Sequence, residues 1–266
     1  MLRSRILMTC VGLLLVCGCG SEQYEARLKE TNAFFEYRQS LDRVLQSGNW
    51  SPPQFAISMR IPQGFTLKPG PRPVKEGEEP QEDTRQPTFL ALHLPGLVGA
   101  WQGEFPADDG NRPVFLYVCS NHQLYLDSVK SKDGPDPATF LSDLENSLST
   151  VMQVTLPPGE STQVGNNIRY AETCPRDPKY ALQKRFTGIT YVPELSIGGV
   201  AIKAQYYGHY NGPIQVAVLA IYPAGIRDRI EDKLLKSLET FTAANQVPAL
   251  KSGPAGGQPA TGGGGF

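Results

Sequence analysis

The spacing of apolar residues divides the chain into stretches of helical and of strand periodicity. Between residues 21 and 46 the apolar side chains recur three and four positions apart, as on one side of an α-helix. They are Tyr24, Leu28, Thr31, Phe34, Phe35, Leu41, Val44 and Leu45. Gly48 follows and predicts the end of this helix. Because most amphipathic helices of this length pack within their own domain, we expect that side to be covered. A stalk or an oligomerisation helix is the alternative.

Alternation of apolar and polar residues predicts strands beyond this helix. The clearest case is 54–61, where Phe55, Ile57, Met59 and Ile61 share one face. Further strands are predicted at 88–94, 100–105, 114–120, 180–191, 200–210 and 214–222. Turn residues at 108–111 and 211–213 connect neighbouring strands of this series.

Two more helices are predicted later in the chain. Asp136 is a good N-cap and Pro137 suits the first helical position. The buried side of that helix is expected to carry Phe140, Leu141, Leu144, Leu148 and Val151. The last helix carries Ile226, Ile230, Leu234, Leu238 and Phe241 on its apolar side.

The order of these elements predicts the fold class. Hairpin turns dominate and no regular βαβ alternation occurs, so we expect an α+β fold: an antiparallel sheet with helices packed on it. The long N-terminal helix precedes this domain, which covers 51–245. The segment 68–87 is charged and Pro-rich, and is expected to be an exposed loop. Residues 246–266 are rich in Gly and Pro and are predicted to be a disordered tail.

Three short motifs resemble the PsbP-like α+β fold. They are Gly198-Gly199-Val200-Ala201 before a long strand, Lys236 to Phe241 in the closing helix, and Ile61 to Phe65 near the start. The resemblance covers about 54–242 and implies accessory and binding roles, without transferring a catalytic residue. The long N-terminal helix, the 68–87 insertion and a pair of cysteines depart from that family.

The first eighteen residues have the features of a signal peptide. Arg3 and Arg5 precede an apolar stretch over 6–17, which is too short to span a bilayer as a helix. Val16-Cys17-Gly18-Cys19 resembles the lipobox of bacterial lipoproteins. The resemblance implies that residues 1–18 are removed and that Cys19 becomes the lipid-carrying N-terminus.

A lipid on Cys19 would tether the protein to a membrane surface without spanning it. The anchored helix then occupies 19–50. Gly20 follows Cys19, and no Asp is present there to signal retention in the inner membrane. We therefore expect an extracytoplasmic protein, on the outer membrane and facing the periplasm if the source has two membranes.

Composition excludes some classes of partner. The chain has 266 residues, 40% of them hydrophobic, and a formal net charge of -1. That balance gives no electrostatic footprint for nucleic acid, so we expect none as a partner. It is ordinary for a globular protein.

Two cysteines besides Cys19 remain after processing, Cys119 and Cys174. In an oxidising compartment such a pair is a candidate disulfide, and two separate buried thiols are the alternative. The spacing of Cys119 and His122 is that of a chelating pair, which Cys174 or His209 would have to complete. One such pair is weak evidence, and we expect no metal and no cofactor.

A group of tyrosines is the remaining candidate site. Tyr206, Tyr207 and Tyr210, with Tyr191 and Tyr222 nearby, form a candidate patch for a glycan or peptide, or else line a half-exposed sheet. No sequence motif marks a catalytic nucleophile. We therefore expect a non-enzymatic binding or structural module that presents its domain to a partner in the cell envelope. The alternatives are a periplasmic small-molecule or glycan binder, and a hydrolase whose Ser pairs with His93, His122 or His209.

Overall fold

The computed structural model describes residues 21–71, 82–130, 135–192, 196–197 and 199–246. The expected signal peptide, Cys19, the centre of the 68–87 loop and the expected tail lie outside the described residues.

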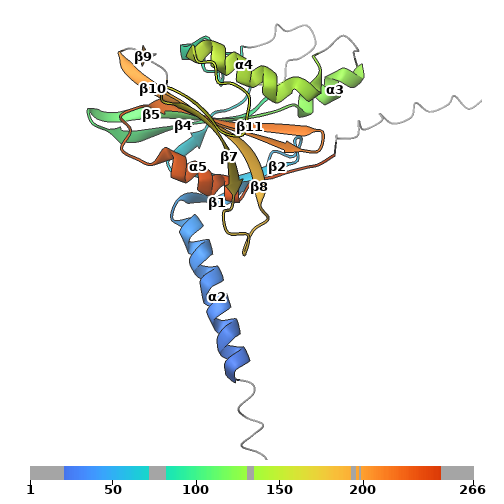
Figure 1. The fold of residues 1–266 in the computed structure, drawn as a ribbon, viewed down its shortest axis with the longest axis vertical. Coiled ribbons are helices and arrows are strands. Elements are labelled where there is room, and N and C mark those ends of the chain that lie inside the picture. The colour runs from blue at the N-terminus through green and yellow to red at the C-terminus, as the bar shows by residue number, and fades with distance from the viewer. Residues whose placement is uncertain (1–20, 72–81, 131–134, 193–195, 198, 247–266) are drawn as a thin grey trace, which may run out of the picture.

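The body of the protein is built on one large antiparallel sheet (Figure 1). Its strand order is β3-β4-β5-β11-β10-β8-β7-β6, with β9 added on β10. The strands are β3 Phe65–Leu67, β4 Leu97–Ala107, β5 Gly110–Ser120, β6 Thr162–Val164, β7 Asn167–Cys174, β8 Lys184–Tyr191, β9 Ser196–Ile197, β10 Val200–Asn211 and β11 Ile214–Pro223. Helices pack against this sheet, so the predicted α+β class is confirmed.

The centre of the sheet is buried on both faces. Along β11, Val216 and Val218 belong to one core cluster, whereas Ala217 and Leu219 belong to the other. Helix α4, Phe140–Met152, covers the second cluster, and α5, Ile230–Glu239, covers the first. Figure 1 shows the two helices on opposite sides of the sheet. Strand β11 is therefore the centre of the fold.

A small second sheet joins the two ends of the domain. It has the order β1-β2-β12, formed by β1 Leu45–Trp50, β2 Ile57–Pro62 and β12 Thr242–Ala243. The Trp50 ring meets the Trp101 ring edge-on, with their centroids 4.7 Å apart, which packs this sheet against β4 of the large one.

The N-terminal helix α2 spans Ser21–Asp42, shorter than predicted. The chain turns at once into β1, so Gly48 lies within a strand and does not end the helix. Two side chains from the domain complete the helix end. Gln63 Nε2 donates to the Asp42 carbonyl at 2.9 Å, and the Arg60 guanidinium pairs with the Asp42 carboxylate at 2.8 Å. The Gln63 bond satisfies one of the carbonyls that a helix C-terminus leaves unpaired.

The expectation that α2 packs along the domain was wrong. Figure 1 shows the helix projecting from the body of the protein, which it contacts at its C-terminal end. Tyr24, Leu28 and Phe35 are 67%, 46% and 60% exposed. The domain covers a different side of the helix, where Tyr37 stacks on Tyr180 with ring centroids 5.2 Å apart. The apolar residues of α2 thus form two stripes, of which one has no cover within the described chain.

Of the other predicted elements, some are confirmed and some are wrong. The Asp136 cap is confirmed, since its side chain accepts from the Ala138 N–H at 2.9 Å. The predicted strand at 88–94 is wrong, because Thr88–Leu90 forms a 3₁₀ turn, η1. Helix α3, His122–Lys130, and strands β6 and β7 were not predicted. Polarity does not follow burial in β7, where polar Asn167 is buried and apolar Ile168 is exposed.

Arg60 is expected to hold the base of α2. Its Nε also donates to the Gln46 carbonyl at 2.7 Å. Arg60→Met removes these donors and leaves partly buried carbonyls unpaired, so we expect the free energy of unfolding to fall by about 1–3 kcal/mol. Urea titration followed by circular dichroism measures this. Asp42→Asn, which keeps the arginine and alters the more exposed partner, should cost much less; an equal loss would show that the ion pair rather than the backbone bonds matters.

Candidate functional site

The tyrosines singled out from the sequence do not form a patch. Tyr206 and Tyr207 are adjacent on β10, and each is buried in a different core cluster. Tyr210 is 58% exposed at the end of the strand. Since neighbouring residues of a strand point to opposite faces, Tyr206 and Tyr207 cannot contact one ligand together. The three residues predicted as a ligand patch are therefore corrected to two core residues and one surface residue.

The predicted candidate disulfide is not formed. Cys119 and Cys174 are both buried free thiols. Cys119 lies on β5 and Cys174 on β7, with β11, β10 and β8 between them. Four strand spacings amount to about 19 Å, whereas a disulfide needs Cα atoms within about 7 Å. The two sulfurs also belong to opposite faces of the sheet. The alternative of two separate buried thiols describes the structure.

The three histidines do not form a common site. His93 is exposed. His122 is buried with its Nδ1 unpaired, and the His209 Nδ1 donates to the Arg185 carbonyl at 2.8 Å. Burial lowers the pKa of both buried imidazoles. Within the described residues no Ser hydroxyl is bonded to these rings, and no group of three or more His, Cys, Asp or Glu side chains is arranged to hold a metal ion.

An apolar cavity that the sequence did not indicate opens at one end of the large sheet. Its volume is about 260 Å³. Strands β5, β10 and β11 supply most of its walls, and the turn η1 supplies the rest. The lining residues are Phe89, Arg112, Pro113, Phe115, Val200, Ile202, Ile221, Tyr222 and Pro223. Apolar walls of this kind are typical of sites for hydrophobic ligands. We call it the β10–β11 cavity.

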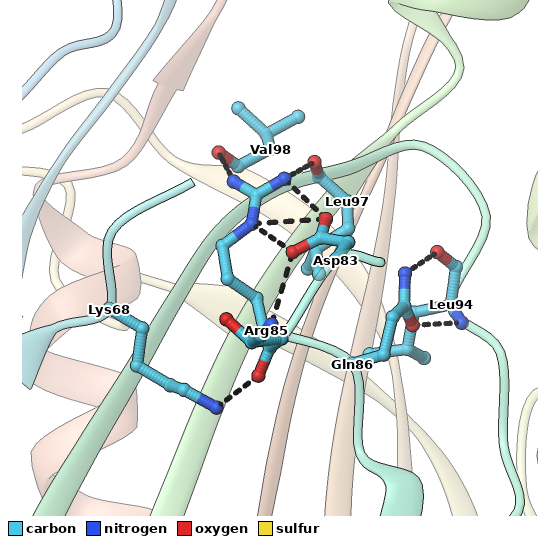
Figure 2. Close-up of polar contacts among 8 residues, drawn as sticks. Lys68, Asp83, Arg85, Gln86, Leu94, Leu97 and Val98 are labelled. Atoms are coloured by element: carbon cyan, nitrogen blue, oxygen red, sulfur yellow. Dashed lines mark hydrogen bonds and ion pairs between the residues drawn. The ribbon is translucent and has the colours of Figure 1, made fainter. Parts of the chain in front are cut away.

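A network of polar contacts fixes the loop that carries Phe89 (Figure 2). Arg85 forms a bidentate ion pair with Asp83, with its Nη2 2.7 Å from the Asp83 Oδ2. The same guanidinium donates to the Val98 carbonyl of β4 at 3.3 Å. Gln86 donates to the Leu94 carbonyl at 3.1 Å and accepts from the Leu94 N–H at 2.8 Å. These bonds close the loop on itself and on β4, so the Phe89 wall of the cavity is held in place.

A second cleft lies where α2 meets the domain. It has a volume of about 660 Å³, and Tyr37, Cys174, Tyr180, Lys236 and Glu239 are among its lining residues. Its charged side chains are largely paired within the protein, as in the 2.9 Å contact of Lys236 Nζ with Glu239. Burial, with the Glu239 carboxylate nearby, raises the pKa of Tyr37 to about 12. This cleft lies at the contact between α2 and the domain. Because its charged groups are paired within the protein, it is a weaker candidate for a ligand site than the β10–β11 cavity.

The sequence could not reveal either hollow, because each is made from residues distant along the chain. The contact of Phe89 with Phe115, whose centroids are 4.7 Å apart, joins a loop to β5. The only sequence signal was the number of apolar residues in 113–115 and 200–202.

Comparison with protein families and with curated proteins identified no relative of this chain. No protein-family model matches the chain, and no curated protein matches it. Among the described helices none has the length and apolar character to cross a bilayer.

The two thiols are expected to be inert in the folded protein. Burial raises the pKa of Cys119 and of Cys174 to about 12. The thiolate is the reactive form, so neither should react with Ellman's reagent at pH 8 until the chain is unfolded in guanidinium. Reductant should leave the gel mobility unchanged. Rapid reaction of the native protein would contradict the buried placement.

These thiols also imply a dependence of stability on pH. A free thiol titrates near 8.5, whereas the folded protein holds both pKa values near 12. The unfolded chain therefore loses these protons first as pH rises. We expect their contribution to stability to be complete below about pH 8 and to fall as pH rises from there toward 12. A Cys119→Ala, Cys174→Ala variant should lose less stability between pH 8 and 10 than the wild type.

Proposed function

We propose that this protein is an extracytoplasmic lipoprotein, anchored through a lipid on Cys19, that acts as a non-enzymatic binding or structural module of the cell envelope. The observation that carries the proposal is the position of α2. The helix begins at Ser21, two residues after Cys19, and projects away from the domain. A helix of 22 residues is about 33 Å long.

This arrangement is that of a spacer between a membrane and a folded body. The spacer is stiff where it meets the domain, because Arg60 and Gln63 bond its last turn and Tyr37 packs on Tyr180. The anchor and domain would thus keep a fixed separation, which a flexible linker cannot provide. Outer-membrane placement remains the favoured location if the source has two membranes, because Gly20 follows Cys19.

The uncovered stripe of α2 supports the partner-binding part of the proposal. Tyr24, Leu28 and Phe35 lie along one side of the helix, and all three are largely exposed. Exposed apolar residues grouped along a helix are typical of contact with another molecule. We propose that a protein of the envelope packs on this stripe.

The anchor is tested by labelling cells with an alkyne analogue of palmitate. The wild type should take up the label and fractionate with membranes. Cys19→Ser should lose both properties. Cys17→Ser, two residues earlier, is the matched control and should keep both. Absence of label from the wild type, or its persistence in Cys19→Ser, would overturn the lipoprotein assignment.

The partner surface is tested by photo-crosslinking in cells. A benzophenone amino acid at position 28 should yield a discrete adduct, because Leu28 lies on the uncovered stripe. The same amino acid at Lys29 is turned by about 100° around the helix and should yield little. Equal adducts from both positions, or none from position 28, would argue against a partner on the stripe.

A further inference from the structure

The uncovered stripe of α2 has the spacing of a seam between two helices. Its four residues are exposed and follow one another at intervals of four, three and four: Tyr24, Leu28, Thr31 and Phe35. Residues at this alternation keep facing the partner in a pair of helices that wind around each other. At about 100° per residue, the four lie within about 60° of the helix circumference. An apolar side this narrow fits another helix, whereas packing on a broad surface needs a side at least about 100° wide.

The domain leaves the stripe accessible. Near the end of α2, Tyr37, Ser40 and Leu41 are buried or partly buried, and they are centred about 150° around the helix from the stripe. Figure 1 shows the helix projecting from the body of the protein. A second helix can therefore approach from the side opposite to the covered one.

The two flanks of the stripe carry charges of opposite sign. Arg27 and Arg38 lie about 60° to one side of its centre, and Glu25 and Glu36 lie about 100° to the other. All four are exposed. When two copies of the helix run parallel, a two-fold axis along them turns the basic flank of each toward the acidic flank of the other. In an antiparallel pair like flanks meet and repel. Since flanking charges select the partner and its direction, the stripe is complementary to a parallel copy of itself.

The proposed lipid anchor gives every copy this same direction. Cys19 precedes the start of α2 at Ser21 by two residues, so a lipid there holds the N-terminus of each helix at the membrane. Four residues per helix bury far less than the roughly 1,200 Å² of a stable interface. Pairing therefore depends on the anchor, which confines the copies to one plane and raises their effective concentration.

We propose that a second copy of this chain packs on the stripe, so that two α2 helices pair in parallel at the membrane. The covered sides of the two helices then face away from each other. The inference rests on the lipid anchor of the proposed function, and it identifies the envelope partner proposed there as the chain itself.

Disulfide crosslinking in membranes from cells that express the full-length protein tests the pair. Cys119 and Cys174 are buried and Cys19 carries the proposed lipid, so an introduced cysteine is the accessible thiol of the mature chain. Leu28→Cys, oxidised with copper phenanthroline, should give a species of twice the chain's mass. Two differently tagged copies expressed together should both be found in it. Lys29→Cys, turned by about 100° from Leu28, should give at least about fivefold less.

The direction of the pair is tested at the membrane end of the stripe. In a parallel pair residue 24 lies opposite residue 24 of the other copy, and Tyr24→Cys should crosslink to itself as well as Leu28→Cys does. In an antiparallel pair residue 24 lies opposite residue 35, about 16 Å from its own counterpart. Failure of Tyr24→Cys to crosslink would therefore exclude the parallel pair.

Exchange of the flanking charges tests self-recognition. In the Leu28→Cys background, Arg27→Glu with Arg38→Glu makes both flanks acidic and should lower the amount of dimer about fivefold, since several exposed ion pairs are lost together. Adding Glu25→Arg and Glu36→Arg restores flanks of opposite sign and should restore the dimer. Circular dichroism of each variant confirms that the helix is retained. A loss that the second pair of substitutions does not reverse would contradict recognition through these charges.

Uptake of the palmitate analogue decides the anchor separately. If the label is present, the inference is overturned by the absence of a Leu28→Cys dimer, by an adduct with a different protein, or by equal dimer from Lys29→Cys, and the anchor stands. If the label is absent, the anchor falls, and the common direction of the helices falls with it.

Discussion

The structure depends on one constraint: a central sheet whose two faces are both buried. Successive side chains of a strand point to opposite faces, so the neighbouring residues of β11 from Val216 to Tyr222 are divided between two cores. This division determines which tyrosine and cysteine side chains can lie near one another. It separates Tyr206 from Tyr207, and it places Cys119 and Cys174 on different sides of the sheet. What remains accessible is found at the ends of strands and on α2, and those are the places where the candidate sites lie.

Local patterns were enough to predict much of the fold. The alternation in β2, β4, β5, β10 and β11, the Asp136-Pro137 start of a helix and the turn at Gly212 all express preferences of the nearest neighbours in sequence. The α+β class follows from their order. Strand β7 was missed because the polarity of its residues does not follow their burial: Asn167 is buried and Ile168 is exposed.

The candidate sites could not be predicted because they depend on pairing between distant segments. Phe89, Phe115 and Ile202 meet only because β5 and β10 flank β11, an order that alternation does not specify. The apolar spacing in α2 was equally ambiguous. It contains the residues that the domain covers, such as Tyr37 and Leu41, together with those it leaves bare, such as Leu28 and Phe35. The spacing indicated a helix correctly, but it does not contain the contacts with the domain, such as those of Arg60 and Gln63 with Asp42 at the end of the helix.

The small sheet has a consequence for the order in which the chain folds. Strand β2 is paired on one edge with β1 and on the other with β12, whose residues come about 180 positions later. The Arg60 N–H bonds to the Thr240 hydroxyl across that separation. Contacts between such distant segments form slowly, because a long loop must close first. The bonds that seat α2 are local and can form early, whereas the third strand of the small sheet can be added only after residue 243 has been synthesised.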